Sequence, residues 1–444
     1  MLRSPTLIPD AHVNEAPAQS ELPRWVKFGL VLYLFLMFLP LQPHLAGINL
    51  IPFRLFLLVT IIPFTLIRIR SDSGFDRIDA LMALLSFWVF LSFIVNHGMA
   101  RFEFAVMSAI EYYGGFLVGR VLVTSLSGFR FFLNAFVIAL ALMIPFAVIE
   151  NRTGTNLWLD FFIKFSTTNM PGPPEMRFGG FRVNSVFAHP IHFGIAGSMF
   201  LGCYFTLYRW GEGRAVRVLV ALAVVFLAQS SAPMLSVGGQ LGLLAWGVMS
   251  RDRWKLLLAL FVAAFVFLSI ASDRGPIIIL VETMTLNPRT AWWRIHIWNF
   301  GIENVWQNPI FGLGMRDWVR PHWLAPTVDN FWLLIAMRHG LPAVACLIGA
   351  VAITITRIMR ATYAQPDMER ARLGYLISML GYIIAFATVF AWGQMVALSM
   401  VFLGAGAFLF APTNGGTPDE ESTNIQPPTP RAIAPRYTRF PAKK

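Results

Sequence analysis

The sequence predicts an all-α integral membrane protein with about 12 transmembrane helices and two long periplasmic loops, the second partly helical. Three observations predict this fold class. Hydrophobic residues make up 56% of the 444 residues and charged residues only 13%, whereas soluble domains are about 25% charged. Apolar runs long enough to span a bilayer recur along the chain. Lysine and arginine fall in short groups between these runs, which is typical of topology signals.

The predicted spans are apolar runs of about 20 residues, the length that crosses the hydrocarbon core of a membrane. They lie near 25–43, 49–67, 79–97, 104–125, 130–149, 186–208, 215–231, 234–250, 255–272, 331–356, 374–392 and 394–411. The two runs that meet at 231–234 could also be divided at another residue. The division affects the number of spans and leaves the fold class unchanged.

The distribution of basic residues predicts the orientation of these spans. Groups of lysine and arginine lie near 68–77, 130, 209–217, 251–255 and 357–372. The short turns on the other side hold none, near 44–48, 231–234 and 392–394. Because positively charged short loops stay in the cytoplasm, we expect both termini to be cytoplasmic. The long loops at about 150–185 and 273–330 then lie on the outer side of the membrane.

The two ends of the chain differ in composition from the rest. We expect a disordered cytoplasmic tail at 1–24, a polytopic membrane domain at 25–411 and a disordered basic cytoplasmic tail at 412–444. The first tail lacks the apolar core of a signal peptide. Cys203 and Cys346 lie inside apolar runs and are interpreted as packing residues. The net charge of +12 forms no single patch, so we predict contact with membrane lipids and no nucleic acid.

The second long loop is rich in aromatic residues. Half of the 14 tryptophans of the chain lie between 292 and 332. One interpretation is an aromatic belt at the membrane interface. The other is that some of these rings stack on sugars, whose apolar faces match aromatic planes. The sequence leaves both interpretations open.

Three pieces of the predicted outer surface carry recognisable motifs. The first, "RFGGFRVNSVFAHP", contains Arg182, Phe187 and Pro190. The second, "NPRTAWWRIHIWNFGIENVWQNPIFGLG", contains Arg289, Trp293, Pro309, Gly312 and Gly314. The third, "TVDNFWLLIAMRHG", contains Asn330 and Leu333. In this order, between helices of this topology, they resemble the O-antigen ligase and exopolysaccharide polymerase family of bacterial membrane proteins.

The resemblance implies a metal-independent glycosyltransferase-type enzyme without a cofactor. Its donor would be a polyprenyl-diphosphate-linked glycan at the periplasmic face of the inner membrane. The glycan would pass to a glycan acceptor in surface or exopolysaccharide biosynthesis, as a polysaccharide polymerase or an O-antigen ligase. The departures from the family pattern place this sequence in a divergent branch, nearer to the exopolysaccharide polymerases. The family histidine falls on Asp329, a family acid falls on Arg338, and "SSAPML" replaces a Ser-Arg signature.

Arginine is the expected ligand of the donor diphosphate, because its planar fork matches phosphate oxygens in pairs. Arg182 and Arg289 fall on the family motifs and are the main candidates. Arg177, Arg338 and Arg54 are further candidates. Ordinary loop solvation or salt bridging is the alternative for any single outer arginine. For Arg54 and the intramembrane Glu111, that alternative is a structural ion pair, whereas Arg338 could face either phosphate or Glu111.

The acceptor hydroxyl needs a general base within hydrogen-bond reach. Asp329 and His339 are the candidates that we favour, ahead of His322 and His189. Asp329 precedes an apolar helix, so its first expected role is to cap that helix. His189, like His192, is more typical of a structural histidine. The outer acids show no Asp-x-Asp spacing, and the sequence no His-x-x-x-His spacing, that would predict a metal site.

Two other functions fit a polytopic membrane protein of this composition. A lipid-linked glycan flippase or exporter should carry ionisable residues at many depths of its helices. Here the ionisable groups concentrate at the outer face, which favours an enzyme. The third hypothesis is a non-enzymatic partner of polysaccharide export machinery, and the sequence leaves it open.

Overall fold

The computed structural model describes residues 21–45, 48–49, 51–71, 74–165, 172–251, 253–272, 279 and 288–410. The described part is mainly helical, which confirms the predicted all-α class. Within it, seven helical segments are long and apolar enough to cross a membrane. The chain is therefore a multi-pass membrane protein, and the expected twelve spans remain a prediction. Most of the tail predicted at 1–24 and the whole of that at 412–444 lie outside the described residues.

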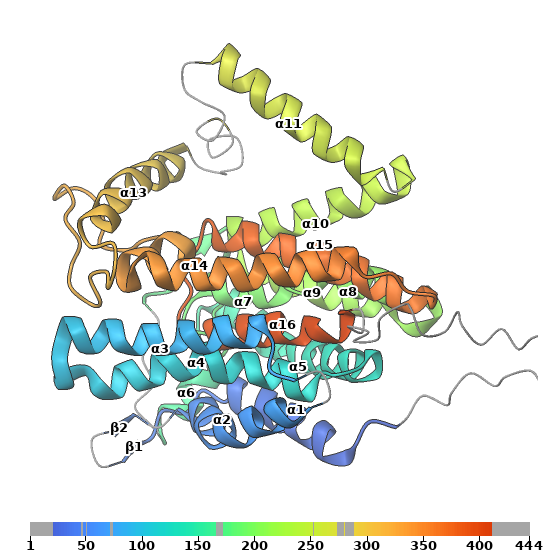
Figure 1. Ribbon diagram of the computed structural model, residues 1–444, viewed down its shortest axis with the longest axis horizontal. Helices are drawn as coiled ribbons and strands as arrows, with labels where there is room; N and C mark the ends of the chain where they lie inside the picture. Colours follow the sequence, from blue (N-terminus) through green and yellow to red (C-terminus); the bar gives the residue numbers. More distant parts are fainter. Residues whose placement is uncertain are drawn as a thin grey trace, which may run out of the picture. The chain divides into compact units, whose positions relative to one another are not determined.

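The elements follow one another in this order (Figure 1). The first half of the chain forms α1 (Arg24–Phe38), β1 (His44–Leu45), β2 (Ile48–Asn49), α2 (Pro52–Arg70), α3 (Arg77–His97), η1 (Gly98–Arg101), α4 (Phe102–Leu122), α5 (Leu126–Thr153), α6 (Leu157–Phe162), β3 (Met176–Arg177), β4 (Gly180–Phe181), α7 (Pro190–Ser198), α8 (Leu201–Leu207) and η2 (Trp210–Glu212). The second half forms α9 (Arg214–Ala228), α10 (Ser231–Ser250), α11 (Trp254–Ala271), α13 (Pro288–Gln307), α14 (Phe331–Arg360), α15 (Pro366–Phe386), α16 (Gln394–Ala405) and η3 (Gly406–Leu409).

Each predicted apolar run coincides with one or two of these helices. The run at 186–208 is divided into α7 and α8, and the division near 231 falls between α9 and α10. The stretch predicted as the first long loop contains α6 and the small β3–β4 hairpin. The stretch predicted as the second long loop contains the helix α13.

Small residues let α4 and α16 pack backbone against backbone. A Cβ atom added to Gly119 would lie 2.1 Å from the carbonyl oxygen of Val401, and one added to Gly404 would lie 2.2 Å from that of Phe116. Helices in membranes associate through such close van der Waals contact, since lipid tails are as apolar as leucine. The α3–α4 and α3–α14 contacts extend this packing to the helices that carry the site.

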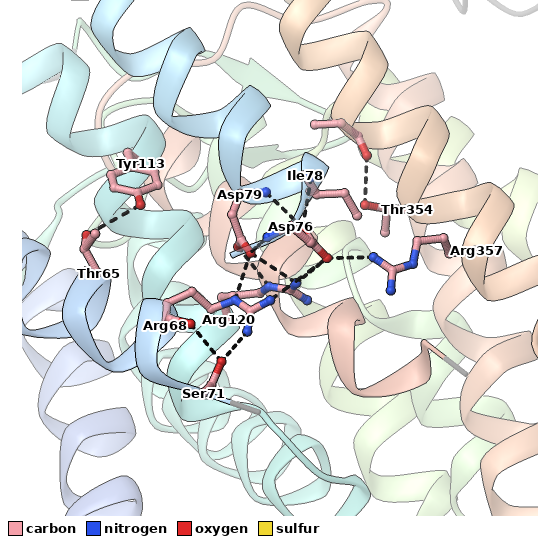
Figure 2. A network of polar contacts seen from close by, with 11 residues as sticks. Thr65, Arg68, Ser71, Asp76, Ile78, Asp79, Tyr113, Arg120, Thr354 and Arg357 are labelled. Atoms are coloured by element: carbon pink, nitrogen blue, oxygen red, sulfur yellow. Dashed lines mark hydrogen bonds and ion pairs between the residues drawn. The ribbon is translucent and has the colours of Figure 1, made fainter. Parts of the chain in front are cut away.

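A buried ionic cluster joins the ends of α2, α3, α4 and α14 (Figure 2). The Asp79 carboxylate accepts from Arg68 Nε at 2.9 Å and from Arg120 Nε at 3.0 Å. The Asp76 carboxylate accepts from Arg120 at 2.7 Å and from Arg357 at 2.6 Å. Arg68 and Arg357 belong to two groups of basic residues that the charge distribution assigned to the same side of the membrane. Their meeting supports that assignment, while the cytoplasmic orientation of this side stays a prediction.

Candidate functional site

Helix α14 is broken close to its predicted outer end. Gly340 has φ +82° and ψ 176°, a backbone conformation that is essentially restricted to glycine. Pro342 follows two residues later and has no N–H to donate to the Arg338 carbonyl. The break therefore exposes backbone groups in an apolar helix, where each unpaired group is costly.

The Pro-x-x-Gly-x-Gly motif supplies the missing partners. Its turn at 309–314 lies against the break, and three backbone hydrogen bonds join the two segments. They run from Leu313 N to the Met337 carbonyl at 2.7 Å, from Gly314 N to the Arg338 carbonyl at 2.9 Å, and from Leu341 N to the Pro309 carbonyl at 2.7 Å. A Cβ atom on Gly312 would lie 2.4 Å from the Arg338 carbonyl carbon. Gly312 is thus required by close backbone approach, and Gly314 by its positive φ of +61°.

His339 lies inside this junction and is almost completely buried, at 4% exposure. Its Nδ1 is hydrogen-bonded to Ser92 Oγ at 2.7 Å, and its ring packs edge-on against Phe93. Its carbonyl accepts from the indole N–H of Trp88 at 3.0 Å. The structure therefore places His339 in packing between α3 and α14, which favours a structural role over that of a base.

Arg338 is directed to the other side of the helix. Its guanidinium lies 5.1 Å from the centre of the Phe390 ring. It also lines a cavity of about 190 Å³ together with the turn residues Leu313 to Asp317 and Val328. Its guanidinium forms no ion pair or hydrogen bond with any residue in the described part of the chain. The expected pairing with Glu111 is absent there, because Glu111 is paired with Arg54 on α2, Nη2 to Oε1 at 2.7 Å. Arg338 can therefore offer its positive charge to a ligand.

The cap of α14 is Asn330, which corrects the expected capping role of Asp329. The Asn330 side chain accepts from Leu333 N at 3.0 Å. Asp329 is the preceding residue, and its carboxylate faces Arg294 of α13 electrostatically. Burial raises the pKa of Asp329 above its usual value, while Arg294 acts in the opposite direction. A carboxylate released from capping and partly desolvated is a suitable proton acceptor.

Arg294 is itself held close to the end of α15. Its Nη2 donates to the Thr388 carbonyl at 3.4 Å, and its buried Nε has no hydrogen-bond partner among the described residues. Burial lowers the pKa of Arg294, and Asp329 opposes this shift. The sequence analysis did not single out Arg294, because it lies inside the second motif stretch but at none of the positions that carry the resemblance.

A second cationic group surrounds Arg182. Its Nη1 donates to Glu175 at 2.7 Å and its Nη2 donates to Ser230 Oγ at 2.7 Å, so a serine of "SSAPML" orients it. Arg177 contacts the same carboxylate at 3.3 Å. The hydrogen bond from Arg182 lowers the pKa of Glu175, whereas burial lowers that of Arg182. His189 lies within electrostatic range, and burial lowers its pKa to about 4, so it is neutral at physiological pH.

The segment 388–392, between α15 and α16, links the two cationic groups. The Phe390 ring contacts Arg338, and the Phe390 carbonyl accepts from His192 Nε2 at 2.9 Å. The Trp392 ring lies 6.2 Å from that of His189, which neighbours Arg182. Thr388 contacts Arg294. Sequence analysis missed this segment, because it contributes backbone carbonyls and aromatic rings instead of charged groups.

The remaining candidates are distributed as follows. Arg54 forms the structural ion pair with Glu111 that was the alternative to donor binding. Arg289 lies in the first turn of α13, and its side chain is outside the described residues. His322 is exposed on the loop after α13. Among the described residues, no group of three or more His, Cys, Asp or Glu side chains could hold a metal ion.

Comparison with known proteins addresses the part of the site between α9 and α14. The family model described as O-antigen ligase matches residues 216–348. These residues, less than half of the chain, are similar to that family, and the match supports an O-antigen ligase family member. The match includes Ser230, Arg294, Asp329 and the broken part of α14, whereas Arg182 and the segment 388–392 lie outside it. No curated protein matches the chain.

The match supports the inferred resemblance and covers the second and third motifs, whereas the first motif lies outside it. It indicates an enzyme of glycan transfer in the membrane, with a lipid-linked glycan and an acceptor as substrates. The geometry adds which side chains of this O-antigen ligase family member are available for such substrates. These are the cation of Arg338, which has no ion-pair partner among the described residues, the carboxylate of Asp329, and the Arg182 group.

Proposed function

We propose that the protein transfers or polymerises polyprenyl-diphosphate-linked oligosaccharide at the periplasmic face of the bacterial inner membrane. The pathway is surface or exopolysaccharide biosynthesis. The observation that carries this proposal is the arrangement around segment 388–392. Arg294 and Arg338 contact it directly, Arg182 adjoins it through His189, and Asp329 faces Arg294. Several arginines beside one partly buried carboxylate suit a diphosphate leaving group and a hydroxyl nucleophile.

The reaction needs no further reactant. The acceptor hydroxyl oxygen attacks the anomeric carbon of the donor sugar, and the bond from that carbon to the diphosphate oxygen breaks. The electron pair of this bond leaves with the polyprenyl diphosphate, and the hydroxyl proton passes to Asp329. Arginine stabilises the negative charge that develops on the leaving oxygen, because preorganised donors act most strongly in a site with little water.

The arginines divide this work according to their surroundings. Arg338 has no carboxylate partner among the described residues and is the first choice for the diphosphate. Arg182 binds Glu175 with one arm of its fork, so the donor would replace this carboxylate. Arg289 joins them by resemblance alone, and Arg177 is a weaker member. Arg54 belongs to the site only if the donor separates it from Glu111.

The proposal is tested by a transfer assay on the protein in proteoliposomes with lipid-linked oligosaccharide. Arg182→Ala and Arg338→Ala should abolish transfer while membrane insertion stays normal. The corresponding lysine variants should restore little activity, since lysine keeps the charge and loses the bidentate fork. Arg152→Ala removes an exposed arginine at the end of α5 and is the matched control. Full transfer in the two lysine variants would contradict the arginine clamp.

Deletion in the native bacterium separates the possible functions. Accumulation of single repeat units on the lipid carrier indicates a polymerase, which the departures from the family pattern favour. Accumulation of finished lipid-linked chains indicates a ligase. If the protein were a flippase, its deletion would leave the lipid-linked glycan inaccessible to a periplasmic glycosidase. This result would contradict the proposal.

A further inference from the structure

An aromatic platform lies on α13 and the loop that follows it. It consists of Trp292, Trp293, His296 and Phe300 from the helix, and Trp323 from the loop. The Trp323 ring centre lies 5.1 Å from that of His296 and 6.0 Å from that of Trp293. Trp323 is nevertheless 47% exposed, and Trp292 is 54% exposed. The rings of the platform are thus packed against one another, and two of its tryptophans remain about half exposed.

The rings are held in place before any ligand binds. Trp293, His296 and Phe300 lie three and four residues apart, so they form one stripe on α13. The loop carrying Trp323 is fixed by Arg320 Nε, which donates to the Leu324 carbonyl at 3.0 Å. The indole N–H of Trp318 donates to the Pro326 carbonyl, also at 3.0 Å. A preorganised platform loses little entropy on binding, which favours a recognition role.

The platform borders the proposed reaction centre. Arg294 follows Trp293 in the helix and so projects about 100° around the axis from it. The charges of Arg294 and Asp329 interact. Helix α13 also packs on the first turn of α14, where a Cβ on Gly301 would lie 2.7 Å from Leu333 Cδ2, and Asp329 precedes this helix by two residues. A molecule resting on the platform therefore lies on the helix that packs against the entry of α14.

The surroundings suit a sugar site. Rings that anchor a protein at the membrane interface turn their apolar bodies toward lipid. Here Trp323 packs against His296, which lies between the tryptophans, and His322 is exposed beside Trp323. A sugar ring presents an apolar face for stacking and hydroxyl groups at its rim, so it matches rings that have polar groups at their edges.

We propose that this aromatic platform is the acceptor subsite, where pyranose rings of the acceptor glycan stack on Trp323 and Trp292 and direct a hydroxyl to Asp329. This inference rests on the proposed function, since it assigns the second substrate of the same centre. It also makes a separate claim, because the platform should bind glycan when no lipid-linked donor is present.

The kinetic experiment compares Trp323 variants in the proteoliposome assay. Trp323→Ala should raise the KM for acceptor about tenfold, with little change in the KM for donor. Trp323→Phe should restore most of the acceptor affinity, because it keeps a planar ring, whereas Trp323→Leu should not. Trp306→Ala, which removes a 67% exposed tryptophan from the same helix, is the control. Full restoration by leucine would overturn the proposal in favour of a lipid anchor.

The binding experiment is independent of catalysis. The probe is the oligosaccharide released from the surface polysaccharide of the producing bacterium, added without donor to the protein in nanodiscs. Saturation-transfer NMR should show contact with the wild type and the Trp306→Ala variant, and loss of contact in Trp323→Ala. Binding without any transfer would support the subsite and contradict the proposed function. Equal saturation in the wild type and Trp323→Ala, or none in the wild type, would overturn the subsite.

Discussion

Replacing Gly340 by alanine should disconnect the broken part of α14 from the turn at 309–314. The substituted residue meets two obstacles. Its φ of +82° with ψ 176° is nearly forbidden to alanine. Its Cβ would also lie 2.0 Å from the Ile310 carbonyl oxygen and 2.4 Å from the carbonyl carbon. Both atoms belong to backbone, so a side-chain rotation cannot relieve the clash.

The expected loss of stability follows from these contacts. The backbone conformation alone costs about 1–3 kcal/mol. If the turn moves away, the three hydrogen bonds across the break are lost, at about 0.5–1.5 kcal/mol each. Together these give roughly 2.5–7.5 kcal/mol, which is a large fraction of the stability of a typical domain. Arg338 would also lose its fixed position, so transfer should fall even at temperatures where the variant stays folded.

The assay is the fraction of monodisperse protein left after heating in detergent, together with transfer activity at low temperature. Gly349→Ala is the matched control on the same helix. There the added Cβ meets only Leu81 Cδ1, at 3.4 Å, and alanine favours the helix by about 0.5–1 kcal/mol. A melting temperature and activity for Gly340→Ala as high as those of Gly349→Ala would refute the reasoning.

Three further predictions concern the site and its side of the membrane. Arg294→Gln removes the positive charge that lowers the pKa of Asp329. The acidic limb of the pH profile of kcat/KM should therefore move to higher pH. An unchanged limb would show that Asp329 is not the titrating base. Glu175→Gln removes the carboxylate bound to Arg182 and should lower the KM for lipid-linked donor, whereas an unchanged KM would mean that the donor does not displace it. In a cysteine-free background, Thr155→Cys should react with a membrane-impermeant thiol reagent from the periplasm and Ala364→Cys should not, and the reverse labelling would invert the topology.

Much of the helical architecture could be predicted, because hydropathy and helix length are local properties of the sequence. The apolar runs locate α2 to α5 to within a few residues. The capping residue of α14 was misplaced by one position. An aspartate and an asparagine are adjacent there, and both residue types cap helices well. Only the backbone geometry decides that Asn330 accepts from Leu333, which leaves the Asp329 carboxylate available.

The contacts between distant segments could not be predicted from the sequence. Segment 388–392 was assigned to the end of a span and a short turn, yet its carbonyls and rings contact Arg294, Arg338 and His192. The Trp88 indole, 251 residues before the His339 carbonyl that it contacts, is another example. Such pairs leave no spacing pattern. A carbonyl acceptor is present at every residue, and its availability depends on where a helix ends.

The two departures from the family pattern that the resemblance implies, at Asp329 before α14 and at Arg338 within it, are connected by charge. By that resemblance, Asp329 stands at the position of a histidine and Arg338 at the position of an acid. The negative charge is then moved to the mouth of the helix, while the deeper position becomes positive. Arg294 faces the displaced acid, and Arg338 has no acid beside it among the described residues. The exchange separates a carboxylate that can accept a proton from a cation that can bind phosphate. The turn that packs against the break at Gly340 fixes the backbone of that cation, Arg338.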